Sequence, residues 1–356
     1  MIANNITQMV NEVYHDETSE VFIMLLWLKF AFCTLLIVHS GAQLSKYGDI
    51  LAEKTGAGRS IIGVVLLASV TSLPELVTGI SAVTFANVPD IAVGDVLGSC
   101  VFNLFILAAL LDAIYRRKPI STSAHHGHIL SAAFGILLLC IVAISILFPQ
   151  YNLPLWWIGS SSLLFVMTYF LALKLISSYE KKQMDRILLE LAVELKYDDI
   201  STRQVATNFA LNAAVVTAAA TFLPKIGAEI ASSTGLGETF VGNIFMALAS
   251  SLPEVVVSIA SVRMGAVDLA IGNLFGSNIF NILILAIDDL FFLQGPLLSL
   301  TNPAHIISAI SAIAMTAISI IGLTYQAEKK TLPWGWDSIA MILVFVVNVL
   351  MLFLVI

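Results

Sequence analysis

Apolar stretches long enough to cross a lipid bilayer recur along the whole sequence. Examples are residues 130–148, 154–173, 305–323 and 338–356, each close to the roughly 20 residues that a membrane-spanning helix needs. Of the 356 residues, 58% are hydrophobic and 12% are charged, whereas about a quarter of the residues in a soluble domain are charged. The sequence therefore predicts an all-α polytopic membrane protein with no room for a large soluble domain.

Breaks of charged, glycine or proline residues divide the chain into about ten predicted transmembrane helices. Their expected ranges are 22–39, 58–85, 91–113, 129–148, 154–177, 204–222, 236–263, 267–292, 303–323 and 335–356. Residues 1–20 are acidic and polar and contain no Lys or Arg, so they lack the positive region of a signal peptide. We expect them to form a short tail outside the membrane.

The distribution of basic residues predicts the orientation. With the N-terminus outside, the inner loops contain fifteen of the 17 basic residues, with Lys225 alone outside and Lys29 in the first span. The fifteen are Lys46, Lys54, Arg59, Arg116, Arg117, Lys118, Lys174, Lys181, Lys182, Arg186, Lys196, Arg203, Arg263, Lys329 and Lys330. Because positive residues remain on the cytoplasmic side, both termini are expected outside, in the cell membrane.

The largest predicted inner segment, residues 178–203, is rich in Lys, Asp and Glu. Its apolar residues have the spacing of an amphipathic helix: Met184, Ile187, Leu188, Leu191 and Leu195. We expect this segment to be a cytoplasmic linker between two transmembrane halves, residues 21–177 and 204–356.

Histidine and cysteine offer two other groups of candidate metal ligands. His125, His126 and His128 form a cluster that binds a metal, senses pH or lies in a solvated interfacial loop. The three cysteines all fall within predicted spans, and their odd number argues against a disulfide framework or a cysteine metal site: Cys33, Cys100 and Cys140. We expect them to be apolar packing residues.

Two motifs occur twice. Residues 72–77 read SLPELV and residues 251–256 read SLPEVV, while 94–103 read GDVLGSCVFN and 272–281 read GNLFGSNIFN. The offset between the copies is about half the chain length. Because each half contains five predicted spans, an odd number, the second copy enters the membrane the opposite way round. The sequence therefore predicts two inverted-topology repeats.

Each repeat has one glutamate at the same depth in the membrane, Glu75 and Glu254. A carboxylate at the membrane centre costs roughly 2.5–3.5 kcal/mol, so it needs a structural or functional reason. One possibility is that each glutamate is protonated or hydrogen-bonded and only holds helices together. The duplication, with a proline before each glutamate, favours a shared cation site.

Pro74 and Pro253 interrupt their helices because proline has no N–H, which leaves the carbonyls of Val70 and Ala249 without their helical donors. Carbonyls freed at membrane depth need water or a cation. Four hydroxyl side chains lie beside the breaks: Thr71, Ser72, Ser250 and Ser251. Together with the glutamates they form an all-oxygen set, which suits hard cations such as Ca²⁺ or Na⁺.

The helices that follow contain polar residues at four-residue spacing, which places each trio on one helix face. The trios are Asp95, Ser99 and Asn103, and Asn273, Ser277 and Asn281, and these faces can complete the site. The glycines of the same motifs form GxxxG pairs, for which we expect a role in close helix packing: Gly94 and Gly98, and Gly272 and Gly276.

These motifs resemble those of the cation/calcium exchangers, whose inverted alpha repeats carry a TSLPE-type and a GNxxGSNxxN/D-type motif. The resemblance extends over nearly the entire chain and implies that Glu75 and Glu254 bind Ca²⁺ with carbonyl help from Thr71 and Ser250. It implies further oxygen ligands, for Ca²⁺ or for overlapping Na⁺ ions, from the backbone of Ala68 and Ala247 and from the side chains of Ser72, Ser251, Ser99, Ser277, Asn103 and Asn281. It also implies that the first and sixth helices slide against the rest.

Three positions depart from the family pattern. Asn281 stands where sodium-coupled members carry Asp, which weakens the case for coupling to several Na⁺ ions. Asp95 and Cys100 replace the usual Asn residues. Asp95 either brings a negative charge to the outer end of the third helix, as a lower-ranked ligand or proton carrier, or is a surface aspartate that reaches out of the membrane.

The favoured function is an antiporter that exchanges Ca²⁺ for Na⁺, with H⁺ coupling as the close alternative and a passive cation channel as a further one. An intramembrane hydrolase lacks a complete constellation, since HExxH and GxSxG are absent, so no enzyme activity and no cofactor are expected. The net charge of −7 argues against nucleic acid. The expected partners are inorganic cations and the lipid bilayer, with no protein partner evident.

Overall fold

The computed structural model describes residues 2–56, 58–115, 118–190, 201–234, 250–330 and 333–355. Within these ranges, nine helical segments are long and apolar enough to cross a membrane. The predicted span 236–263 falls partly in the undescribed residues 235–249, and helix α12 (Leu252–Arg263) is its described part. The all-α polytopic membrane fold predicted from the sequence is confirmed.

The described residues of the first half form nine α-helices, three π-helical segments, one short 3₁₀ helix and one small hairpin. They are α1 (Ile2–Thr55), α2 (Arg59–Ile61), η1 (Ile62–Leu67), α3 (Ala68–Thr71), α4 (Leu73–Ser81), η2 (Ala82–Ala86), α5 (Pro89–Phe105), η3 (Ile106–Leu111), α6 (Asp112–Ile114), α7 (Ile120–Ser123), α8 (Gly127–Leu147), η4 (Pro149–Tyr151), β1 (Pro154–Leu155), β2 (Ile158–Gly159) and α9 (Ser160–Glu190). The segments from α2 to η2 form one span, and those from α5 to α6 form the next.

The described part of the second half is simpler. Its elements are α10 (Thr202–Thr234), α12 (Leu252–Arg263), α13 (Val267–Phe291), η5 (Leu297–Ser299), α14 (His305–Tyr325) and α15 (Trp336–Val355). Helix α13 is the most buried of the candidate spans, and it contacts helices from both halves, including α4, α5, α8 and α9. It is therefore the helix around which the described core is assembled.

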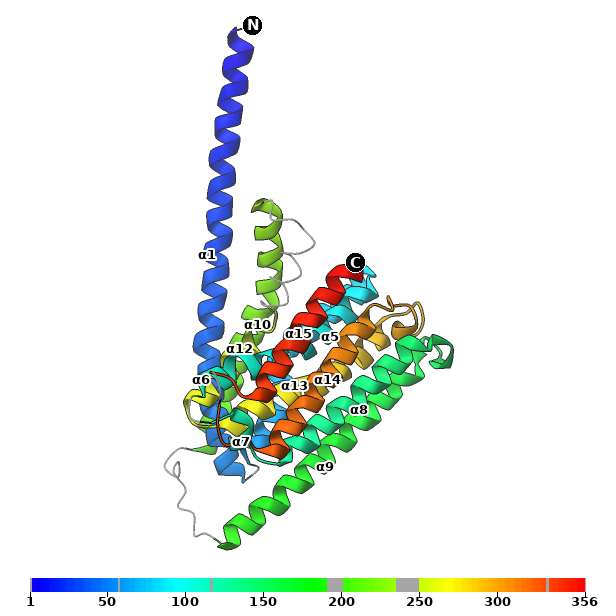
Figure 1. The fold of residues 1–356 in the computed structure, drawn as a ribbon. Coiled ribbons are helices and arrows are strands. Elements are labelled where there is room, and N and C mark those ends of the chain that lie inside the picture. The colour runs from blue at the N-terminus through cyan, green and yellow to red at the C-terminus, as the bar shows by residue number, and fades with distance from the viewer. Residues whose placement is uncertain are drawn as a thin grey trace.

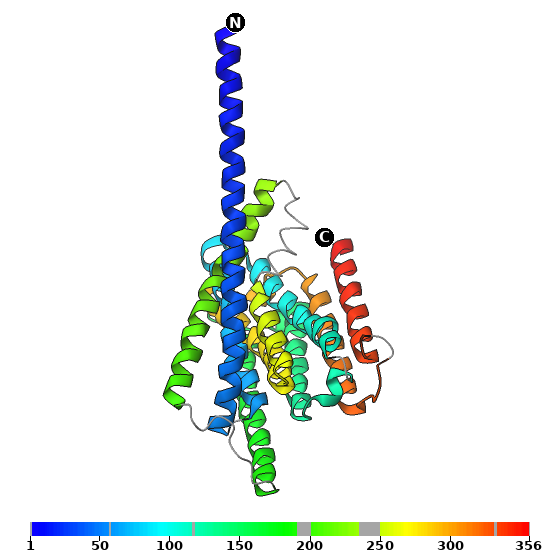
Figure 2. The same ribbon diagram turned by 90° about the vertical axis from the view of Figure 1, so that its left-hand side faces the viewer.

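Helices α1 and α10 pack against each other along one side of the molecule, apart from the tilted bundle of α5, α8, α9, α13, α14 and α15 (Figures 1 and 2). The N-terminus and the C-terminus lie toward the same end of the molecule in Figure 1. Helices α4 and α12, which carry the duplicated proline motif, contact both the α1–α10 pair and the bundle.

Helix α1 is much longer than the predicted span 22–39 and includes residues 2–20, which we expected to form a tail. At its other end, Leu44 and Ile50 are buried in an apolar cluster with Val205 and Phe209 of α10. This packing extends the helix beyond the membrane-length stretch, because most helical stability in proteins comes from tertiary contacts.

The predicted span 154–177 begins too early, because residues 154–159 form the hairpin of β1 and β2. Trp156 has a φ of 65°, a left-handed conformation that a helix does not contain. The Oδ1 atom of Asn152 accepts a hydrogen bond from the Ser161 amide at 3.0 Å, which satisfies one of the free N–H groups at the start of α9.

Helix α9 continues to Glu190, so the first part of the predicted linker 178–203 is helical. Residues 191–200 are outside the described residues. The side chains of the predicted amphipathic helix, from Met184 to Leu195, are also outside the described part of the structure. That helix therefore stays a prediction.

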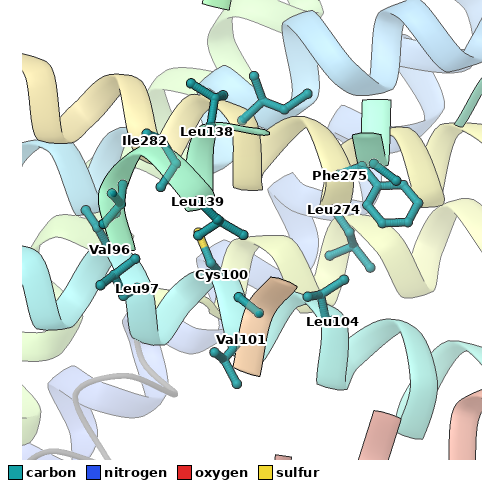
Figure 3. Close-up of a cluster of buried hydrophobic side chains, with 14 of the residues drawn as sticks. Val96, Leu97, Cys100, Val101, Leu104, Leu138, Leu139, Leu274, Phe275 and Ile282 are labelled. Atoms are coloured by element: carbon teal, nitrogen blue, oxygen red, sulfur yellow. The ribbon is translucent and has the colours of Figure 1, made fainter. Parts of the chain in front are cut away.

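The apolar core lies between α5, α8 and α13, as Figure 3 shows. Leu97 and Cys100 of α5 are fully buried among Leu138 of α8 and Leu274 and Ile282 of α13. Inside a membrane such packing holds helices together through close contact, since lipid is as apolar as the side chains.

Close packing explains most of the duplicated glycines. A Cβ atom on Gly276 would lie 2.5 Å from the Cα atom of Val64, and one on Gly272 would lie 2.8 Å from the Ser60 carbonyl. A Cβ atom on Gly94 would meet His305 at 3.2 Å, whereas Gly98 has no such neighbour among the described atoms within 4 Å. The predicted packing role is confirmed for Gly272 and Gly276.

The two halves share contacts at matching positions. The Asp112 carboxylate accepts hydrogen bonds from the amides of Ile120 at 2.8 Å and Gly335 at 2.6 Å. In the second half, the Asp289 carboxylate accepts bonds from Leu297 at 2.6 Å and from Gly159, before α9, at 2.7 Å. We propose from these matching contacts that residues 21–177 and 204–356 are two inverted repeats.

Substitution of Gly276 by alanine is expected to destabilise the protein by about 1–3 kcal/mol, because the added methyl group overlaps the backbone of Val64. The matched control is Gly135→Ala in α8, where a Cβ atom has no neighbour within 4 Å. There the change in stability is expected to be neutral or favourable, by up to about 1 kcal/mol. Thermal unfolding in detergent measures both, and equal stability of the two variants would contradict the packing role.

Candidate functional site

Both copies of the proline motif break their helices in the same way. Ser72, between α3 and α4, has φ −90° and ψ 7°, and Ser251, before α12, has φ −86° and ψ 8°. Pro74 and Pro253 follow as the second residues of α4 and α12. The new helix starts therefore lie inside the protein, where free N–H groups and the helix dipole favour a negative charge.

Glu75 and Glu254 stand in the first turns of these two helices, and each is only 1% exposed. Their carboxylates are close enough for their charges to interact. The Ser72 hydroxyl donates a hydrogen bond to the Oε1 atom of Glu254 at 3.1 Å, which links the two halves. Both carboxylate oxygens of Glu75, and Oε2 of Glu254, have no hydrogen-bond partner in the part of the chain that the structure describes.

Hydroxyl groups from the neighbouring helices surround the glutamates. The Ser277 hydroxyl lies 3.5 Å from Oε1 of Glu254 and 3.4 Å from the Thr71 hydroxyl. On the other side, the hydroxyls of Ser99 and Ser251 are 3.3 Å apart. The structure thus brings the predicted hydroxyl residues of one half against those of the other.

The other predicted ligands have mixed outcomes. Asn103 donates to the side chain of Asn278 at 3.0 Å, while both amide atoms of the buried Asn281 have no hydrogen-bond partner. Ser250 and Ala68 are buried. Ala247 is outside the described residues, so its predicted carbonyl ligand stays a prediction.

Asn278 belongs to this polar layer and was missed by the sequence prediction. Its side-chain amide donates to the Cys100 carbonyl at 3.1 Å and accepts from Asn103. The sequence signal that could have identified Asn278 is a difference between the two motif copies, GDVLGSCVFN and GNLFGSNIFN. Asn278 occupies the position at which the first copy has Cys100, and the structure joins these two positions.

The donor set fits a hard cation. Among the described residues, no three His, Cys, Asp or Glu side chains come together as a metal site. The possible ligands are instead two carboxylates with hydroxyl, amide and carbonyl oxygens, which suit Ca²⁺ or Na⁺ better than softer metals. The buried oxygens without partners need a proton, water or cation to satisfy them.

The side chains of the three clustered histidines have different partners, although the backbone amide of His125 donates to the same Asp268 oxygen that His128 contacts. His128 is fully buried, with Nε2 3.0 Å from an Asp268 oxygen, so the solvated-loop interpretation is wrong for this residue. Nδ1 of His125 is 3.5 Å from a Glu180 oxygen, and His126 contacts Gln326. The described residues contain no cluster of three metal ligands here.

Hydrogen bonding to Glu180 is the main cause that raises the pKa of His125 above its usual value. A raised pKa in the folded state adds stability that is fully present below the unfolded pKa and is lost as the pH rises through the folded pKa. We therefore expect His125→Gln to lower the melting temperature more at about pH 5.5 than at about pH 8.5. Melting curves of both proteins at the two values test this, and an equal difference would contradict it.

Comparison with known proteins adds a family and a fold. Residues 25–177 and 205–354 match the sequence model of the sodium/calcium exchanger protein family. The chain is 31% identical over 254 residues to the inner membrane protein YrbG of Escherichia coli, across 70% of this chain and 74% of that protein. It is 25% identical over 365 residues to the sodium/calcium exchanger MaX1 of Methanosarcina acetivorans, across 94% and 99%.

A solved structure of the sodium-calcium exchanger NCX_Mj, soaked with Na⁺ and Sr²⁺, matches with a TM-score of 0.70. The match covers 92% of this chain and 99% of that one at 18% sequence identity. At this identity the likeness concerns the fold, and it agrees with the arrangement in Figure 1.

Proposed function

The chain belongs to the sodium/calcium exchanger protein family, and we propose that it exchanges Ca²⁺ for Na⁺ at a site formed by Glu75 and Glu254. The observation that carries this proposal is a pair of buried glutamates, one from each half of the chain, in which three of the four carboxylate oxygens have no hydrogen-bond partner among the described residues. Two ionised carboxylates whose charges interact repel each other strongly in a medium of low dielectric constant. A divalent cation cancels both charges, and so do two monovalent ions.

Competition for the same oxygens explains exchange. Ca²⁺ takes six to eight oxygen ligands in flexible geometry, and the hydroxyls of Ser72 and Ser277 already lie beside Glu254. Na⁺ ions that use the same carboxylates displace Ca²⁺. The family consists of exchangers, so the hydrolase interpretation is set aside, and the two broken helices favour a carrier over a passive channel.

Helices α1 and α10 are the proposed moving part. Helix α1 meets α12 at the hydroxyls of Ser45 and Ser261, which are 2.6 Å apart. It also meets α12 at Gly41, which lies against Val256. Apolar side chains of α1 and α10 pack in one cluster with Leu252 and Val256 of α12. Apolar contacts are not directional, so they allow one helix to slide along another. Sliding of this pair past α4 and α12 would open the site to one side of the membrane at a time.

Proton coupling is the second candidate, and Asn281 motivates it. Asn281 is buried without a hydrogen-bond partner, at the position where the family resemblance gives sodium-coupled members an aspartate. One carboxylate fewer leaves less negative charge to bind several Na⁺ ions.

We place the protein in the cell membrane with both termini outside, on the basis of its inner basic loops.

Substitution of Glu75 or Glu254 by glutamine is expected to weaken Ca²⁺ binding by at least about a hundredfold, or about 2.8 kcal/mol. Ca²⁺ uptake into proteoliposomes, measured well below saturation, should fall by the same factor. Glutamine retains the volume and removes the charge. The control is Glu180→Gln, which alters a buried glutamate beside His125 and should retain transport. Uptake at the wild-type rate by both site variants would rule out this site.

The coupling ion is tested with imposed gradients. An outward Na⁺ gradient is expected to accelerate uptake of radiolabelled Ca²⁺ at a clamped pH, and Asn281→Asp should steepen the dependence on Na⁺ because it adds a negative charge to the site. Uptake that follows a pH gradient and ignores Na⁺ decides for the proton-coupled alternative. A linear single-channel current would instead indicate a channel.

A further inference from the structure

Asp288, near the end of α13, is a buried carboxylate outside both duplicated motifs. Asp288 is 0% exposed, and neither of its carboxylate oxygens has a hydrogen-bond partner among the described residues. The adjacent Asp289 is the opposite case, since it accepts hydrogen bonds from the amides of Leu297 and Gly159 and from the Ser162 hydroxyl. Asp289 therefore has a structural role, whereas no contact within the described structure accounts for Asp288.

The surroundings of Asp288 are acidic and closely fitted. A Cβ atom on Gly79 of α4 would lie 2.7 Å from Oδ1 of Asp288, so the carboxylate lies directly against the bare backbone of Gly79. Helix α5, which carries Asp95, packs against α13, and the negative charge of Asp95 acts on the Asp288 carboxylate. The Oδ2 atom of Asp95 is also buried without a partner, and its side chain interacts with Ser250.

The two aspartates lie on the same side of the central glutamates. Asp95 is one helical turn before Ser99, and Asp288 is two turns, about 10 Å, beyond Asn281. Helices α5 and α13 run in opposite directions in the proposed inverted repeats, so these displacements point to the same membrane face. The charge of Asp95 also acts on Glu75, so Asp95 is coupled electrostatically both to Asp288 and to the glutamate pair.

We propose that Asp95 and Asp288 form a second site for a hard metal cation, with the Ser250 hydroxyl and water as further ligands. Two carboxylates with hydroxyl and water oxygens are the ligands that Ca²⁺ prefers. A cation placed between them compensates two buried charges that have no other compensation. The idea that this second site passes cations from the outer face to Glu75 rests on the proposed function. Cation binding by Asp95 and Asp288 does not depend on it.

The test is equilibrium binding of radiolabelled Ca²⁺ to the full chain in nanodiscs, with Glu75→Gln and Glu254→Gln combined to remove the central pair. This double variant is expected to retain a saturable Ca²⁺ site. Adding Asp288→Asn or Asp95→Asn should weaken that site by at least tenfold. Absence of a saturable site in the double variant, or unchanged binding after both aspartate substitutions, would overturn the proposal.

Two further variants separate a built site from general negative charge. Gly79→Ala retains both aspartates but displaces the Asp288 carboxylate, so it should also weaken binding and serves if Asp288→Asn does not fold. Asp90→Asn removes a charge from the same end of α5, where Asp90 is 46% exposed and pairs with His305. It should leave binding unchanged, and an equal loss with this control would overturn the proposal. Retained binding in a protein that shows no exchange would contradict only the proposed function.

Discussion

The cost of a buried carboxylate in a membrane organises this structure. Each one needs donors, a proton or a cation. Asp112 and Asp289 have donors: each accepts backbone amides from the loops that follow its helix, and Lys330 also pairs with Asp112 at 2.7 Å. Glu75 and Asp288 are both buried, and their carboxylates have no hydrogen-bond partner within the described ranges. Carboxylates with donors, such as Asp112 and Asp289, hold loops to helix ends. Carboxylates without donors, such as Glu75 and Asp288, require a proton, a water molecule or a cation.

The broken helices and the close glycine packing depend on each other. Pro74 and Pro253 start new helices inside the protein, and the positive ends of those helices lie beside Glu75 and Glu254. A break in a membrane is tolerated only where neighbouring helices protect the backbone. Gly276 allows α13 to approach the backbone of η1, immediately before the first break. The proline motif that carries the glutamate therefore needs the glycine motif, which permits the close approach of α13.

Structural features that depend on neighbouring residues in the sequence could be predicted, and features that depend on contacts between distant parts of the fold could not. Apolar length predicted the spans, and proline predicted the breaks at Ser72 and Ser251. The extension of α1 past residue 39 follows from its packing on α10, and the hairpin at residues 154–159 follows from loop contacts, so neither has a local signal. Asp288 lies outside the duplicated motifs, and the corresponding residue of the first half, before Asp112, is Leu111. A comparison of the repeats therefore overlooks it.

The two halves match in backbone contacts but differ in charge. Asp95 corresponds to Asn273, and Asp288 corresponds to Leu111, so the additional carboxylates are not duplicated. In an inverted repeat, a residue at the start of the motif in one copy and a residue beyond the end of the motif in the other lie on the same side of the site. Both additional charges therefore fall on one side of the glutamate pair. In an alternating-access carrier with this arrangement, a cation that approaches from the side of Asp95 and Asp288 meets a more negative potential than one that approaches from the other side. The local cation concentration is therefore higher at that face.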